Sequence, residues 1–205
     1  MARQRTHLIL FLTCMLLLFG CSAPKQELPV DEGTAEPGTQ VTFRGDEIKL
    51  LGSAVAVGQS VPSVKLVDAM SMKEVDLSEV KGSVLLLSIV PSLDTPVCES
   101  QTHYLGEEGD KLGGEVQRIT ISRDLPFAQS RFAKEANLTD IQYLSDYKQG
   151  DFGRSTGLLM DGMMILTRAV IVVDKQGVIQ HIQVVPEITH LPDMESAFQK
   201  AKELL

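Results

Sequence analysis

The stretch VLLLSIV, from Val84 to Val90, leads directly into PSLDTPVC, from Pro91 to Cys98, and this junction decides the fold. The first stretch is short and apolar on both faces, which is typical of a central strand covered on two sides. Because Pro96 suits the first turn of a helix, we expect a helix from Pro96 to about Gly109. Cys98 would then lie beside the unpaired N–H groups and the positive dipole end of that helix. Both features favour thiolate over thiol, so Cys98 is predicted to be reactive rather than an inert core residue.

The sequence on either side of this junction predicts further strands and helices in alternation. A hairpin is expected over Val41–Gly52, with its turn at Arg44-Gly45-Asp46. The other expected strands are Ser63–Ala69, Val116–Ser122, Ala169–Asp174 and Val178–Val185; the other expected helices are Asp124–Ala136, with Asp124 as its N-cap, Asp151–Gly157 and Pro192–Leu205. This order predicts an α/β domain with a mixed central sheet flanked by helices and an extra N-terminal β-hairpin, which resembles a thioredoxin-like fold.

Composition limits the class of protein before any motif is considered. The chain has 205 residues, 43% hydrophobic and 22% charged, which fits one globular domain with an appendage. Its formal net charge of -8 gives no counterion release on nucleic acid, so we expect no nucleic-acid partner. Three cysteines are too few for a dense disulfide scaffold, and their odd number leaves at least one with another role.

Residues 1–20 have the features of a secretory signal. Two arginines precede the apolar run Leu8–Phe19, which is shorter than the ~20 residues that span a bilayer. The stretch LFGC, from Leu18 to Cys21, resembles a bacterial lipobox, in which the cysteine is lipidated and becomes the new N-terminus. We therefore expect a lipoprotein signal peptide at residues 1–20 and a lipid anchor at Cys21. Ordinary signal-peptidase cleavage and an uncleaved anchor are the alternatives.

A lipid anchor at Cys21 would hold the protein to the membrane on the extracytoplasmic side of the cell envelope, in the periplasm if the source is Gram-negative. Residues 21–40 are rich in Pro, Gly, Glu and Thr and have little to bury, so the lipidated cysteine should be followed by a flexible tether. The folded domain would then cover residues 41–205. Because Cys14 would leave with the signal, Cys98 would be the only free thiol of the mature chain.

The residues around Cys98 resemble the active-site signature of the peroxiredoxins, P-x-x-x-T-x-x-C after an apolar strand. The form PSLDTPVC is similar to that of the thiol peroxidase branch. Three other segments resemble the same branch in the same order: DLPFAQSRF (Asp124–Phe132), LTRAVIVVD (Leu166–Asp174) and EITHLPDMESA (Glu187–Ala197). The resemblance covers residues 41–205, so it implies the fold as well as the chemistry.

This resemblance implies the role of each residue in the site. Cys98 would be the nucleophile that attacks a hydroperoxide and becomes a sulfenic acid. Thr95 would hydrogen-bond the thiolate or the peroxide, Arg168 would supply the cation beside the sulfur, and Pro91 would shield the sulfenate. Structural roles remain open for three of them: a helix cap for Thr95, a surface ion pair for Arg168 and a strand end for Pro91.

The sequence departs from the family at one position that matters. Members of the branch usually carry a resolving cysteine after the segment that ends at Phe132, but this chain has Ala133 there. An internal catalytic disulfide within residues 41–205 is therefore impossible, and we predict a one-cysteine mechanism. The sulfenate would be reduced by an external thiol, by a thioredoxin-like protein or by Cys98 of another chain. A homodimer is expected from the resemblance alone.

Two other classes of function remain as alternatives. One is an extracytoplasmic thioredoxin-like thiol–disulfide oxidoreductase, but such enzymes use C-x-x-C where this chain has Thr95 and Cys98. The other is a non-catalytic redox sensor on the same fold. The scattered histidines lack metal-ligand spacing and no phosphate-binding loop is present, so we expect neither a metal nor a cofactor.

Overall fold

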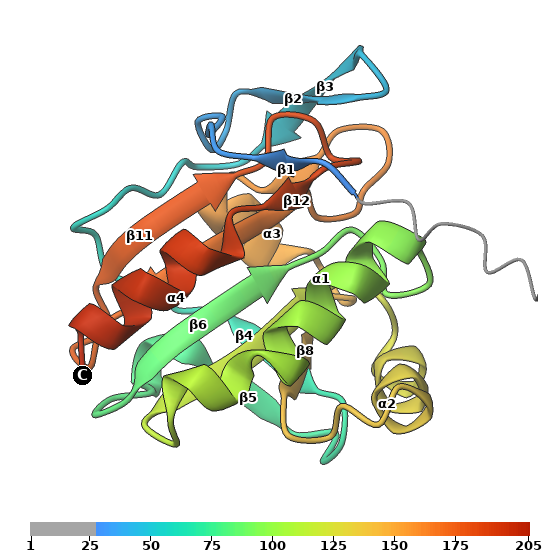
Figure 1. The fold of residues 1–205 in the computed structure, drawn as a ribbon. Coiled ribbons are helices and arrows are strands. Elements are labelled where there is room, and N and C mark those ends of the chain that lie inside the picture. Colours follow the sequence, from blue (N-terminus) through green and yellow to red (C-terminus); the bar gives the residue numbers. More distant parts are fainter. Residues whose placement is uncertain (1–27) are drawn as a thin grey trace, which may run out of the picture.

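The computed structural model describes residues 28–205 (Figure 1). The predicted signal peptide and the predicted lipidation site Cys21 lie outside the described residues. No helix within the described part of the chain combines the length and the apolar character needed to cross a membrane.

A seven-stranded mixed sheet forms the centre of the domain, in the order β11-β10-β6-β7-β8-β4-β5. Strand β6 pairs in parallel with β7, and β7 with β8, whereas β10 and β4 run antiparallel to their neighbours. The strands are β4 (Lys65–Asp68), β5 (Glu74–Asp76), β6 (Val84–Ile89), β7 (Val116–Ser122), β8 (Gln142–Ser145), β10 (Ala169–Val173) and β11 (Ile179–Val184). The predicted mixed central sheet is confirmed.

Strand β6 is fully buried because both of its faces are covered. Leu86 packs in one hydrophobic cluster with Leu105 and Phe198 from the helices on one side, and Leu87 packs in a second cluster with Phe152 on the other. Figure 1 shows α1 and α4 on the same side of the sheet. The helices are α1 (Pro96–Glu107), α2 (Pro126–Glu135), α3 (Asp151–Thr156) and α4 (Met194–Glu203), with short 3-10 turns at Leu77–Glu79 and Gly109–Leu112. The alternation of these two clusters along β6 explains why its sequence is apolar without a period of two.

The predicted N-terminal hairpin is present as β2 (Gln40–Phe43) and β3 (Asp46–Leu51), which β9 (Leu159–Met160) extends to a small sheet. Phe43 pairs with Asp46, so only two residues make the turn. Those residues, Arg44 and Gly45, have φ values of 54° and 86°. Positive φ at both central positions matches the right-handed twist of the strands, and glycine adopts it without strain.

Residues 30–35 are docked on the domain, whereas the sequence predicted a flexible tether as far as residue 40. Strand β1 (Val30–Asp31) pairs in parallel with β12 (Leu191–Pro192), and Ala35 N–H donates to the Val184 carbonyl at 2.8 Å. We call residues 30–35 the N-terminal strap. The composition of residues 30–35 did not predict this docking. The segment is held mainly by backbone groups of residues far along the chain, and such contacts leave no pattern in the local sequence.

Two predicted helix starts are shifted. Helix α2 begins at Pro126 with Leu125 at the N-cap, so Asp124 is not the cap that the sequence predicted. Helix α4 begins at Met194, and the Asp193 side chain caps it by accepting a hydrogen bond from Ser196 N–H at 3.0 Å. The Asp124 carboxylate turns instead toward the β6–α1 connection, because that connection offers it donors.

Gly52, at the end of β3, allows a close approach that no other residue permits. Its φ is +106°, and a Cβ there would lie 1.9 Å from the Arg154 carbonyl oxygen. Gly52→Ala should therefore lower the free energy of unfolding by about 3 kcal/mol or more. Gly58→Ala is the matched control, because its φ is +89° but nothing lies within 4 Å of its added Cβ. That control should cost only about 1–2 kcal/mol. Equal losses in chemical denaturation would contradict this account of Gly52.

Candidate active site

Cys98 lies in the first turn of α1, at the carboxyl end of the buried strand β6. Its side chain is completely buried. Thr95 is the N-cap, with extended backbone angles of φ -130° and ψ 142°, and the first helical hydrogen bond runs from Glu99 N–H to the Thr95 carbonyl at 2.9 Å. The N–H groups of the turn that holds Cys98 thus precede the helical ladder, and their partial positive charge favours a thiolate.

Arg168 is the cation beside this sulfur. It immediately precedes β10 and is only 2% exposed. Its Nη2 lies 3.4 Å from Cys98 Sγ, although the two residues are far apart in the sequence. Its Nη1 donates to the Gln101 side-chain oxygen at 2.7 Å, and its Nε donates to the Ile188 carbonyl at 2.9 Å. None of these acceptors is a carboxylate, so the charge of the guanidinium is available to the sulfur and to any oxygen bound next to it.

Gln101 is a residue of the site that the sequence analysis missed. It lies one helical turn after Cys98 and is fully buried. Its side-chain amide group donates to Ser88 Oγ at 2.8 Å while its oxygen accepts from Arg168. Gln101 therefore fixes the guanidinium relative to both β6 and α1. The i,i+3 spacing from Cys98 places both residues on one face of the helix and was the signal that could have identified it.

The Asp124 carboxylate holds the turn between β6 and α1. It accepts hydrogen bonds from Ser92 Oγ at 2.7 Å, from Leu93 N–H at 2.8 Å and from Ser122 Oγ at 2.7 Å. Since Ser122 ends the neighbouring strand β7, this cluster ties the turn before Cys98 to the sheet. Asp124 thus supports the site from a position where the sequence predicted only a helix cap.

The structure places Thr95 and Pro91 differently from Arg168. The Thr95 side chain is exposed, and its hydroxyl donates to the Ser92 carbonyl at 3.0 Å. Pro91 is buried two residues after the end of β6. Cys98 and Arg168 are therefore in contact, whereas the Thr95 hydroxyl is engaged with the turn that precedes the helix.

A hollow of about 380 Å³ opens where the start of α1 faces α2. It is lined by Leu93, Asp94, Thr95, Pro96, Glu99, Phe132, Glu135 and Ala136. Thr95 and Pro96, at the start of α1, line this hollow, whereas Cys98 is completely buried and is not part of its lining. Among the side chains that the structure describes, which leave out Asp110 and residues 1–27, no three of His, Cys, Asp or Glu gather as a metal site would require.

Comparisons with known proteins agree on the family. The family model for Redoxin matches residues 56–199. A thiol peroxidase of Staphylococcus saprophyticus is 39% identical over 165 residues, which are 80% of this chain and 99% of that protein. A thiol peroxidase of Bacillus subtilis is 36% identical over 166 residues, 81% of this chain and 98% of that one. This chain also matches the crystal structure of a peroxiredoxin-like protein from Aquifex aeolicus, with a TM-score of 0.75 and 33% identity. The match covers 83% of this chain and 100% of the Aquifex chain.

The chain therefore belongs to the Redoxin family as a peroxiredoxin of the thiol peroxidase type, and it is a thiol-dependent peroxidase. The predicted thioredoxin-like fold is confirmed. This class of enzyme takes a hydroperoxide as its oxidising substrate and a thiol as its reductant.

Replacing Gln101 should weaken the site through Arg168. Gln101→Leu keeps the volume of the side chain but removes the acceptor of Arg168 Nη1. We expect a loss of stability of about 1–3 kcal/mol and a fall of roughly tenfold in the second-order rate constant for hydrogen peroxide, because the guanidinium loses a fixed orientation. Stopped-flow kinetics and thermal unfolding measure the two effects.

Gln199→Leu is the matched control, because Gln199 is exposed on α4. Its peroxide rate should stay within about twofold of that of the unchanged chain, since surface substitutions are close to neutral. A Gln101→Leu rate as high as that of this control would contradict the role assigned to Gln101.

Proposed function

We propose that Cys98 is the nucleophile of the peroxidase and that Arg168 is its electrostatic partner. The Cys98 thiolate attacks the terminal oxygen of a hydroperoxide; an S–O bond forms, the O–O bond breaks, and the departing oxygen takes a proton to leave as water or an alcohol. Cys98 becomes a sulfenic acid. The observation that carries this proposal is the 3.4 Å contact between Arg168 Nη2 and Cys98 Sγ inside the protein.

Arg168 suits this step because of its fixed, planar set of donors. Negative charge moves from the sulfur to the departing oxygen, and a guanidinium held at three points can interact with both atoms without rearranging. In an interior that excludes water, such an interaction is far stronger than at a surface. Pro91 and Thr95 remain proposed contributors, Pro91 as a shield of the sulfenate and Thr95 as a donor to peroxide, once its hydroxyl leaves the Ser92 carbonyl.

The burial of Cys98 implies that the turn before α1 opens during the cycle. A completely buried sulfur cannot meet either a peroxide or a reducing thiol. The hollow between α1 and α2 supplies the space toward which residues 92–96 could move. Its polar lining, which includes Asp94 and Thr95, is compatible with a small, water-soluble peroxide.

We further propose a one-cysteine mechanism. Cys98 is the only cysteine in the sequence from residue 28 to residue 205, and Ala133 is buried in α2 where the family resemblance predicts a resolving cysteine. The sulfenate would then be reduced by a small thiol, a thioredoxin-like protein or a second copy of this chain. A homodimer is consistent with the exposed apolar side chains of Met70, Met72 and Phe127, the last of which is 71% exposed.

We place this peroxidase in the cell envelope, where it would protect against hydroperoxides. The support is the sequence of residues 1–21, which resembles a lipoprotein signal with Cys21 as the lipidated residue. Because the N-terminal strap begins at residue 30, only residues 22–29 would separate the anchor from the folded domain. The active site would then work close to the membrane surface, on its extracytoplasmic side.

Intact-mass analysis after one equivalent of hydrogen peroxide tests the nucleophile and the mechanism together. The chain should gain one oxygen at Cys98, and an added thiol should convert this product to a mixed disulfide and then to the thiol. Cys98→Ser should abolish the oxygen gain and rapid peroxide consumption, whereas the matched control Cys14→Ser, made in the uncleaved chain that still carries residue 14, should leave both unchanged.

An intrachain disulfide that contains Cys98, formed in the absence of any added thiol, would contradict the one-cysteine mechanism. Rapid peroxide consumption by Cys98→Ser would contradict the assignment of the nucleophile. Ala133→Cys provides a comparison, because a cysteine restored at that position should produce the loss of two hydrogens that marks an intrachain disulfide.

A further inference from the structure

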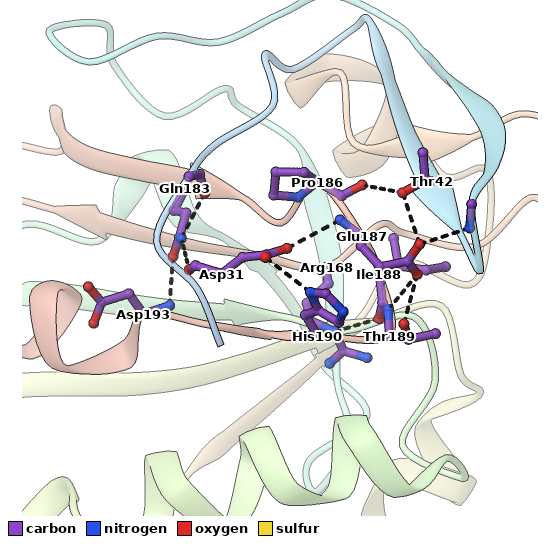
Figure 2. Close-up of polar contacts among 12 residues, drawn as sticks. Asp31, Thr42, Arg168, Gln183, Pro186, Glu187, Ile188, Thr189, His190 and Asp193 are labelled. Carbon is purple, nitrogen blue, oxygen red and sulfur yellow. Dashed lines mark hydrogen bonds and ion pairs between the residues drawn. The ribbon is translucent and has the colours of Figure 1, made fainter. Parts of the chain in front are cut away.

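The loop between β11 and β12, residues 185–190, carries the backbone groups that hold Arg168 (Figure 2). Arg168 Nε donates to the Ile188 carbonyl at 2.9 Å, and the Arg168 carbonyl accepts from Val185 N–H at 2.9 Å. A shift of this loop would therefore move the guanidinium relative to Cys98 Sγ. We call residues 185–190 the arginine loop.

The β2–β3 hairpin forms hydrogen bonds with one side of the arginine loop. Thr42 N–H donates to the Pro186 carbonyl at 2.7 Å, and Ile188 N–H donates to the Thr42 carbonyl at 2.9 Å. The Glu187 carboxylate accepts from the N–H groups of Arg44 and Gly45 at 3.0 and 3.1 Å, and from Thr42 Oγ1 at 2.9 Å. The hairpin thus holds residues 186–188, which lie on the N-terminal side of the Ile188 carbonyl.

Glu187 is ionised over the whole neutral range. Burial by itself would raise its pKa, but the hydrogen bonds from Arg44 N–H, Thr189 Oγ1, Gly45 N–H and Thr189 N–H together lower the pKa of Glu187 to about 2. A permanently charged carboxylate is a strong acceptor, so the hairpin contact does not weaken between mildly acidic and alkaline pH.

The N-terminal strap makes polar contacts with the other side of the arginine loop, as Figure 2 shows. Asp31 Oδ1 lies 3.0 Å from His190 Nδ1, and Asp31 Oδ2 accepts from Glu187 N–H at 3.4 Å. The Asp31 carbonyl accepts from Gln183 Nε2 at 2.6 Å, while the Gln183 oxygen accepts from Asp193 N–H at 2.9 Å. Asp31 therefore contacts the loop one residue before and two residues after Ile188.

From these contacts we propose that Asp31 is a positioning residue of the peroxidase and that the N-terminal strap completes its active site. By holding Glu187 N–H and the His190 ring, Asp31 fixes the Ile188 carbonyl between them, and this carbonyl sets the orientation of the Arg168 guanidinium at the sulfur. Asp31 acts only through Arg168 and does not touch the reacting atoms. The proposal rests on the function proposed above for Cys98 and Arg168.

The test compares Asp31→Ala with Glu32→Ala in the full chain. Glu32 is the matched control, because it is the next residue along the strap, carries the same charge and is exposed. Asp31→Ala should slow the reaction of Cys98 with hydrogen peroxide by about threefold to tenfold, because a displaced guanidinium stabilises the charge on the departing oxygen less well. Glu32→Ala should stay within about twofold of the unchanged chain.

Two further variants test whether Asp31 acts through Arg168. In an Arg168→Ala background, adding Asp31→Ala should change the rate by less than about twofold, because coupled residues are not additive. Asp31→Asn, which keeps an acceptor oxygen for Glu187 N–H, should recover at least about half of the rate that Asp31→Ala loses.

A peroxide rate unchanged in Asp31→Ala would overturn the proposal, whether or not the melting temperature falls. An Asp31→Ala effect that persists in full in the Arg168→Ala background would also overturn it, since Asp31 would then act elsewhere. A failure of the proposed function can be distinguished from these outcomes, because Arg168→Ala alone would then leave the peroxide rate unchanged. Peptide-resolved mass spectrometry follows Cys98 specifically, so Cys14 and Cys21 do not contribute to the measurement.

Discussion

The structure depends on placing one buried guanidinium against one buried sulfur. Burying a positive charge costs several kcal/mol unless hydrogen-bond acceptors replace the lost water. Arg168 finds three such acceptors in two distant parts of the chain: Cys98 and Gln101 on α1, and the Ile188 carbonyl on the arginine loop. The fold must therefore bring β6, β10 and the end of β11 together before the site exists.

The sheet order meets this requirement directly. Strand β10 is the antiparallel neighbour of β6, with Ala169 opposite Ile89, so the residue that precedes β10 lies beside the residues that follow β6. Cys98 reaches the site because only a short connection separates it from the end of β6, and Arg168 reaches it because it immediately precedes β10. Since β11 pairs with β10, with Val184 opposite Ala169, the loop after β11 returns to the same edge and delivers the Ile188 carbonyl. The β2–β3 hairpin and the N-terminal strap then close over that loop.

The residues proposed to carry the chemistry could be predicted from the sequence, because the signal is local or is shared with a family. The apolar run before Pro91 and the proline at the start of a helix predicted the strand and the helix, and the position of Cys98 predicted the proposed nucleophile. Arg168 followed from the resemblance of the segment that contains it. The mixed sheet and the N-terminal hairpin were also predicted, because their strands have clear apolar patterns and turns.

The residues that hold the chemistry in place were harder to predict. The Ile188 carbonyl is a backbone acceptor, which any residue could supply, so no side-chain type marks it. Asp124 fits an N-cap as well as a long-range acceptor, and only the three-dimensional structure distinguishes the two. The strap was expected to be a tether because composition reports how much a segment can bury, whereas this segment is held by hydrogen bonds such as those of Asp31.

The most direct test of the central claim compares two reactions of Cys98 in the unchanged chain and in Arg168→Ala. Alkylation by iodoacetamide needs only the thiolate, whereas reduction of hydrogen peroxide also needs the charge on the departing oxygen to be stabilised. If the Arg168 guanidinium stabilises that charge, the peroxide rate constant should fall by at least about tenfold more than the alkylation rate constant. Equal changes in both rate constants, or no change in either, would contradict the account.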